Sequence, residues 1–179
     1  MKRISSRPPW FSGGLAITEA EFYDAVRQRD ADAAARLPAF FAGCADSGLT
    51  VVPADSAMTL YWLDERFGKV KFATLFKDGT LGTNHICAMA RDAGDRAIGE
   101  RYLQGVAALI DGAAVDCTGS DMTRCVRRDG ALPPIGPVLA RAEAWLGLVR
   151  DAIAAFRALA ASTDGGRGGG HGVPPGVSP

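Results

Sequence analysis

The stretch KVKFATLFKDGTLGTNHICAMA, residues 69–90, decides the fold of this chain. Its first eight residues have the composition of a β-strand, with aromatic and β-branched side chains. Asp78-Gly79 follows, and this dipeptide is a strong signal for a two-residue turn between antiparallel strands. We therefore predict a β-hairpin with one strand at 69–76 and a second from about Thr80 to Ala90.

A two-residue turn would also fix the register of the hairpin, since a slip by one residue exchanges the two faces of a strand. Phe76 is then expected opposite Leu81, and Phe72 opposite His85. Carried onto the preceding strand, the same face is predicted to collect Met58, Leu60, Trp62, Val70, Phe72, Phe76, Leu81, Cys87 and Met89. His85 is thus expected on an apolar surface beneath a helix.

Upstream of this hairpin, the sequence predicts two helices and two further strands. Thr18 with Glu21 three residues later forms a capping box, which starts a helix. A second amphipathic pattern ends at Gly48 and is interrupted by Pro38, so this helix is expected to kink or to begin there. LTVVP (49–53) and AMTLYWL (57–63) then alternate as strands.

Downstream, a helix from Asp95 is expected to cover the apolar face of the sheet. Residues 113–135 are ambiguous, with one short strand near 123–127 and a second Asp-Gly turn. A long C-terminal helix starts near Pro137, and its apolar stripe comprises Val138, Leu139, Ala142, Trp145, Leu146, Val149, Ile153 and Phe156.

The predicted fold class is α+β: two N-terminal helices, a four-stranded antiparallel β-meander, a covering helix and a long C-terminal helix. Residues 16–162 are expected to form a single domain. Residues 1–15 are expected to be flexible, and 163–179 to be a disordered tail because they are rich in glycine and proline.

Parts of the chain resemble small bacterial domains of unknown function that pair a helical start with an antiparallel sheet. The resemblance runs from GLTVVPADSAMTLYWL through LFKDGTL to RYLQGVAALIDG and covers about residues 18–112. It implies an α+β fold. It carries over no catalytic residue.

Composition narrows the class of function. The 179 residues include 20 basic and 20 acidic side chains, so no overall field draws the chain to nucleic acid or to an anionic membrane. No apolar run approaches the roughly 18 residues of a membrane-spanning helix. We expect a cytoplasmic protein without cofactors, in which Cys44, Cys87, Cys117 and Cys125 are thiols.

His85 and Cys87 are the candidates for chemistry. On one strand face they would place an imidazole beside a thiol, as in a small hydrolase, or, with Cys117 and Cys125, in a metal-dependent enzyme. The spacing does not match a usual zinc site, because seven residues separate Cys117 from Cys125. Packing of His85 against a neighbouring hydroxyl is the competing interpretation, and it is favoured.

Two binding hypotheses remain open. The leading one is a non-enzymatic protein-binding or regulatory module that contacts a partner or a second copy through the C-terminal helix, with Trp145 and Val149 in the contact if the stripe stays partly exposed. The other is binding of single-stranded nucleic acid through Tyr61, Lys69 and Lys71 on the polar face of the sheet. An ordinary solvated surface is the alternative to the second.

Overall fold

The structure is a computed structural model that describes residues 16–165. Its elements, in chain order, are α1 (Glu19–Arg27), α2 (Ala31–Asp46), β1 (Leu49–Pro53), β2 (Ala57–Asp64), β3 (Gly68–Phe76), β4 (Leu81–Gly82), α3 (Ile86–Ala93), α4 (Ala97–Ala108), β5 (Ala113–Asp116), β6 (Cys125–Arg128), α5 (Gly136–Ala140) and α6 (Ala142–Gly165). The α+β class is confirmed. The predicted segment 1–15 and most of the predicted tail lie outside the described residues, and α6 continues to Gly165, past the predicted domain end at 162.

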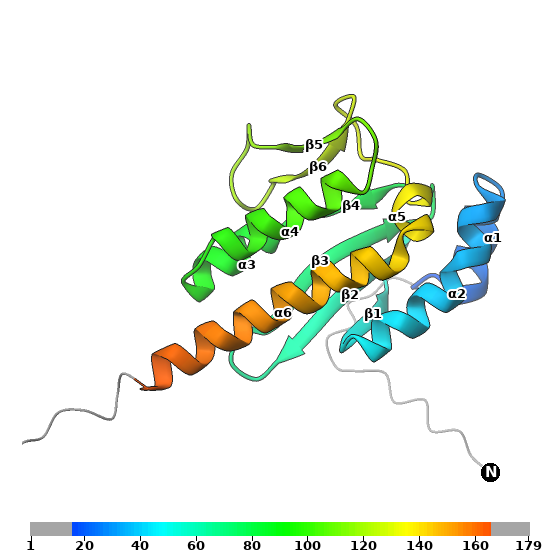
Figure 1. Ribbon diagram of the computed structural model, residues 1–179. Coiled ribbons are helices and arrows are strands. Elements are labelled where there is room, and N and C mark those ends of the chain that lie inside the picture. The colour runs from blue at the N-terminus through cyan, green and yellow to red at the C-terminus, as the bar shows by residue number, and fades with distance from the viewer. Residues whose placement is uncertain (1–15, 166–179) are drawn as a thin grey trace, which may run out of the picture.

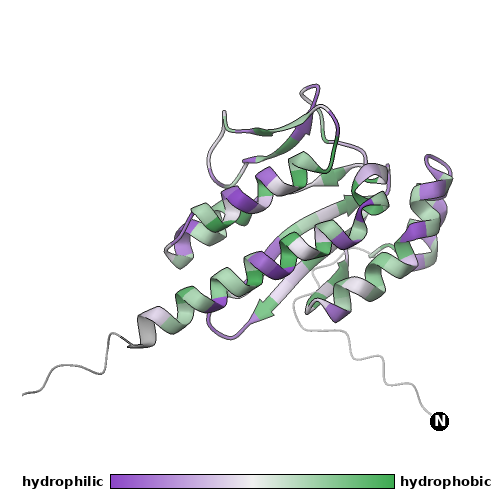
Figure 2. Cartoon of the chain, viewed as in Figure 1, coloured by the Kyte–Doolittle hydropathy of each residue, from purple (hydrophilic) through white to green (hydrophobic). Residues whose placement is uncertain are grey.

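The main sheet has the antiparallel order β1-β2-β3-β4, and β5 and β6 form a separate two-stranded ribbon. Figure 1 shows α2, α4 and α6 on one face of the main sheet, with the β5–β6 ribbon beyond α4. The apolar side chains of that face and of the helices form one core cluster. Polar residues gather in the loops, most clearly between β2 and β3 (Figure 2).

The N-terminal helices begin where side chains satisfy their first backbone N–H groups. In the predicted capping box, the Glu21 N–H donates to Thr18 Oγ1 at 3.2 Å and the Thr18 N–H donates to Glu21 Oε2 at 2.8 Å. Asp30 caps α2 by accepting from the Ala33 N–H at 2.9 Å. Helix α2 therefore starts at Ala31 and continues through Pro38, so the expectation that it begins at Pro38 is wrong.

The predicted fourth strand at 80–90 is wrong beyond its first residues. Strand β4 contains only Leu81 and Gly82, and α3 begins at Ile86. The apolar run around HICAMA fits a strand or a short helix equally well, because a short run has no decisive period. Tertiary packing selects the helix: Ile86, Cys87 and Ala90 are buried, and α3 approaches α4 at Gly99, where an added Cβ would lie 2.7 Å from Cys87 Cα.

The turn at Asp78-Gly79 is longer than predicted. The Phe76 N–H donates to the Thr80 carbonyl at 2.9 Å, and the Gly79 N–H donates to the Phe76 carbonyl at 3.0 Å. Gly79 has a φ of 82°, which glycine adopts without strain. Because the loop comprises 77–79, Leu75 and not Phe76 lies opposite Leu81.

A β-bulge also makes the register between β2 and β3 differ from the predicted one. Trp62 pairs with Val70 as predicted, but the register shifts between Leu60 and Tyr61, so Leu60 pairs with Ala73 and not with Phe72. Residues after a bulge change face. Ala73 and Leu75 are therefore buried in the core, whereas Phe76 leaves the predicted apolar face and is only partly buried.

The ambiguous region forms the ribbon, and the predicted short strand near 123–127 is β6. Asp129 and Gly130 have φ values of 52° and 77° and make the second Asp-Gly turn. The predicted long C-terminal helix is divided at Arg141 into α5 and α6.

Candidate functional site

The face of the main sheet that points away from the helices carries the residues predicted to bind nucleic acid. Alternation and register place the following side chains on this outer face: Thr50, Val52, Thr59, Tyr61, Leu63, Lys69, Lys71, Thr74 and Phe76. Within residues 16–165, no helix covers it (Figure 1). Thr59 and Thr74 at its centre are buried, whereas Tyr61, Lys71 and Phe76 are partly exposed.

The structure brings Tyr61, Lys69 and Lys71 together. Tyr61 and Lys71 are direct cross-strand partners on β2 and β3. The Lys69 ammonium lies 4.2 Å from the centre of the Tyr61 ring, which is a cation–π distance. An aromatic ring and two ammonium groups thus form one surface.

Lys71 has the most informative environment of the three. Its ammonium donates to Asn84 Oδ1 at 3.2 Å, and burial lowers its pKa. In the described part of the chain it forms no ion pair with a carboxylate. A half-buried cation held only by a neutral amide retains an unmet preference for an anion.

His85 lies beside Lys71 and not on the predicted apolar strand face. It precedes α3 with a φ of 84°, and its side chain is partly buried. Burial and the neighbouring Lys71 ammonium lower the pKa of His85. Both effects favour the neutral form of the imidazole, next to a cation.

Cys87 lies in the first turn of α3 and belongs to the buried core cluster. Its side chain has no exposed area, and burial raises the pKa of its thiol to about 11. A nucleophilic cysteine needs a thiolate near neutral pH. The environment of Cys87 disfavours one, so the geometry gives no support to the predicted imidazole–thiol pair.

The four cysteines are free, as predicted. Cys117 is exposed on the loop after β5, whereas Cys125 is buried in β6. Among the described residues, no group of three or more histidine, cysteine or acidic side chains is placed to hold a metal ion. The predicted set of His85, Cys87, Cys117 and Cys125 is thus not assembled.

A pocket of about 260 Å³ continues the outer face toward the ribbon. It is lined by Phe76, Gly82, Asn84, Thr123, Cys125, Arg127 and Leu132. Arg127 is held at its rim by Asp116 at 3.0 Å and by the Gly130 carbonyl at 3.0 Å. Sequence reasoning missed Phe76 and Asn84 as site residues, because the bulge and the short β4 that place them there leave no clear sequence signal.

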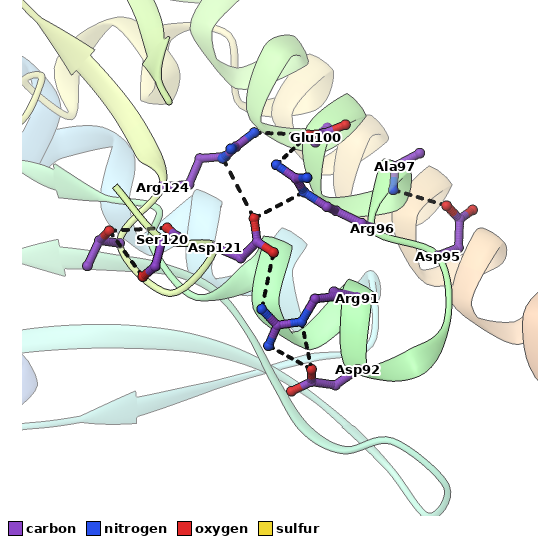
Figure 3. Close-up of polar contacts among 10 residues, drawn as sticks. Arg91, Asp92, Asp95, Arg96, Ala97, Glu100, Ser120, Asp121 and Arg124 are labelled. Carbon is purple, nitrogen blue, oxygen red and sulfur yellow. Dashed lines mark hydrogen bonds and ion pairs between the residues drawn. The ribbon is translucent and has the colours of Figure 1, made fainter. Parts of the chain in front are cut away.

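A network of ion pairs fixes the wall of this pocket that comes from the ribbon (Figure 3). Asp121 pairs with Arg91 at 3.2 Å and with Arg96 at 3.0 Å. Arg124 pairs with Glu100 of α4 at 2.9 Å. These contacts tie the loop between β5 and β6 to α3 and α4, and thereby position Thr123 and Cys125.

The charged groups of this network pair with one another, so the network offers no unpaired charge to a ligand. Its arginines Arg91, Arg96 and Arg124 are matched by Asp92, Glu100 and Asp121. The Arg124 Nε is buried without a hydrogen bond, and Asp121 Oδ1 lies 3.9 Å away. We therefore assign the network a positioning role.

The C-terminal stripe is buried inside the chain. Trp145 has no exposed area and Val149 is 1% exposed, and Leu139, Leu146, Ile153 and Phe156 are buried with them. The exposed stripe on which the protein-contact hypothesis depends is thus absent from these residues. In the described segment, no helix has the length and apolar character needed to span a bilayer.

A scan against models of protein families finds no match, and searches of curated proteins and of solved structures find no significant match either. The resemblance to small bacterial domains therefore stays an expectation. Any function must be argued from the geometry of the site.

The pKa of His85 makes stability depend on pH. Because its pKa in the folded state lies below the ordinary value of 6.5, the unfolded chain takes up this proton first, so the free energy of unfolding should fall as the pH drops through 6.5. Asparagine tolerates a positive φ and does not titrate. We expect His85→Asn to show a smaller fall in urea midpoint between pH 7 and pH 5 than the wild type, and an equal fall would contradict this.

Proposed function

We propose that the protein binds single-stranded nucleic acid across the outer face of its main sheet. The observation that carries the proposal is Lys71: a half-buried ammonium, held by the Asn84 amide, without a carboxylate partner among residues 16–165. A phosphate oxygen would supply the charge-assisted hydrogen bond that this group lacks.

The tyrosine beside Lys71 supports a nucleic acid over a simple anion. Tyr61 offers a partly exposed ring on a rigid strand, and a base of any identity can stack on such a ring. Lys69 lies over the ring at 4.2 Å on an exposed side chain.

The geometry favours single strands over duplexes. In a duplex the faces of the bases are covered by their neighbours, so a ring on a sheet has nothing to stack against. Within residues 16–165, moreover, no helix that would enter a groove protrudes from the outer side of β2 and β3 (Figure 1). A strand with unstacked bases can lie flat across β2 and β3.

The alternatives draw less support from the structure. Burial of Trp145 and Val149 removes the surface that a partner helix would contact, and Cys87 is a buried neutral thiol. We also propose a cytoplasmic location, since a reducing compartment suits four free thiols.

The test is fluorescence anisotropy of a labelled single-stranded oligonucleotide, titrated with the full chain over a range of salt concentrations. We expect log K to fall linearly against log salt, with a slope of about −0.7 for each phosphate that a cation such as Lys71 neutralises. A duplex of the same sequence should bind more weakly. Absence of binding at low salt would overturn the proposal.

A further inference from the structure

The pocket between Phe76, Asn84 and the ribbon adjoins the proposed strand path. Asn84 belongs to both the strand path and the pocket, because its Oδ1 accepts a hydrogen bond from the Lys71 ammonium and its side chain lines the pocket. A chain of nucleotides with one phosphate at Lys71 would therefore have a base beside the pocket mouth. The inference below rests on the proposed function.

The pocket has an aromatic wall set in a fixed position. Phe76 follows the bulge and lies on the outer face, next to Gly82 of β4. A Cβ at Gly82 would lie 3.0 Å from Phe76 Cε2, so the glycine is what lets the ring lie close against β4. This packing holds an apolar ring in place at the pocket, as a stacking platform requires.

A polar group in the lining of the pocket can form a hydrogen bond with the edge of a base. The Asn84 Oδ1 is engaged by Lys71, and its Nδ2 group donates to no other side chain in the described part of the chain. Thr123 Oγ1 donates to the Ser120 carbonyl at 3.1 Å and lies 3.5 Å from Ser120 Oγ, so it is engaged within its own loop. The pocket thus presents the Asn84 amide as its hydrogen-bond donor.

We propose that this pocket takes one unstacked base of the bound strand, stacked on Phe76 and hydrogen-bonded by the Asn84 Nδ2. Its volume of about 260 Å³ suits a single planar ring system. Pockets for whole drug-sized ligands run from about 300 to 1,000 Å³, so a larger occupant would not be enclosed.

The experiment compares Phe76→Leu with a matched control, Phe41→Leu. Both substitutions remove one partly buried ring, but Phe41 lies on α2 and lines a different pocket, beside β1. In anisotropy titrations, Phe76→Leu should weaken binding of an oligothymidine by about tenfold without changing the salt slope, whereas Phe41→Leu should match the wild type. An oligomer made of abasic nucleotides should bind wild type and Phe76→Leu equally.

The failures of the two proposals are distinguishable. If the wild type binds with the expected salt slope and Phe76→Leu binds equally well, the base pocket is overturned and the proposed function stands. If the wild type does not bind, both fall. Should Phe76→Leu not fold, Gly82→Ala displaces the same ring with one methyl group, and unchanged affinity there would also overturn the pocket.

Discussion

Replacing Lys71 by glutamate is expected to reduce affinity for a single-stranded oligonucleotide by about ten- to a hundredfold. A hydrogen bond to a charged group contributes about 1.5–3 kcal/mol, and each 1.4 kcal/mol is a factor of ten. The substitution removes this bond and places a carboxylate where the phosphate would lie. Anisotropy titrations at two salt concentrations measure both the affinity and the salt slope, which should become shallower by about 0.7, the contribution of one phosphate contact on a single strand.

The matched control is Lys77→Glu. Lys77 is an exposed lysine in the loop between β3 and β4, so the two variants change the net charge equally. Lys71→Met, which removes the charge but keeps the stem, should lie between the wild type and Lys71→Glu. Equal losses for Lys71→Glu and Lys77→Glu would mean that overall charge, and not a defined contact on the outer face, governs binding.

Replacing Trp145 by alanine is expected to lower the free energy of unfolding by about 3–5 kcal/mol, the range for removing a buried aromatic side chain. Trp145 has no exposed area, and its ring stacks on Phe40 with centroids 4.7 Å apart. Its Nε1 donates to the buried Tyr102 hydroxyl at 2.9 Å. Urea unfolding followed by circular dichroism measures the loss.

Tyr102→Phe isolates the polar part of this contact. It keeps the packing of the ring against Phe72 but leaves the Trp145 Nε1 without its acceptor, so we expect a loss of about 1–3 kcal/mol. A loss below about 1 kcal/mol for Trp145→Ala would show that the stripe is not buried in the folded chain. The hypothesis of a partner bound through the C-terminal helix would then regain its basis.

Local signals in the sequence predicted much of this fold. The capping box depends on two residues only, Thr18 and Glu21, and both of its hydrogen bonds form. The first three strands were predicted to within one residue at each end, because turn residues bound each apolar alternation. The pairing of Trp62 with Val70 followed from the intervening loop.

The errors come from features that only tertiary packing decides. The residues after Gly82 turn into α3, since Ile86 and Cys87 bury more completely against α4 than on an edge strand. The bulge opposite Leu60 has no local signature, yet it reverses the face of Phe76. Tyr61 and Lys71 could be paired from the sequence, because they lie between the β2–β3 loop and the bulge, where the predicted register is still correct.

The position of His85 shows how these errors in the predicted fold change the predicted functional site. On a regular strand it would face the core beside Phe72 and Cys87. The early end of β4 instead leaves it at a turn, next to Lys71, while Cys87 enters the core. The site of interest therefore moves from a buried imidazole and thiol to a cationic, partly aromatic surface.

The most direct test of the account is a nuclear magnetic resonance titration of the labelled protein with a single-stranded oligonucleotide. If the outer face binds the strand, the largest amide shift changes should fall on β2 and β3 around Tyr61 and Lys71, and at Asn84 and His85. Changes confined to α4 and α6, or no changes at a saturating concentration in low salt, would contradict the account.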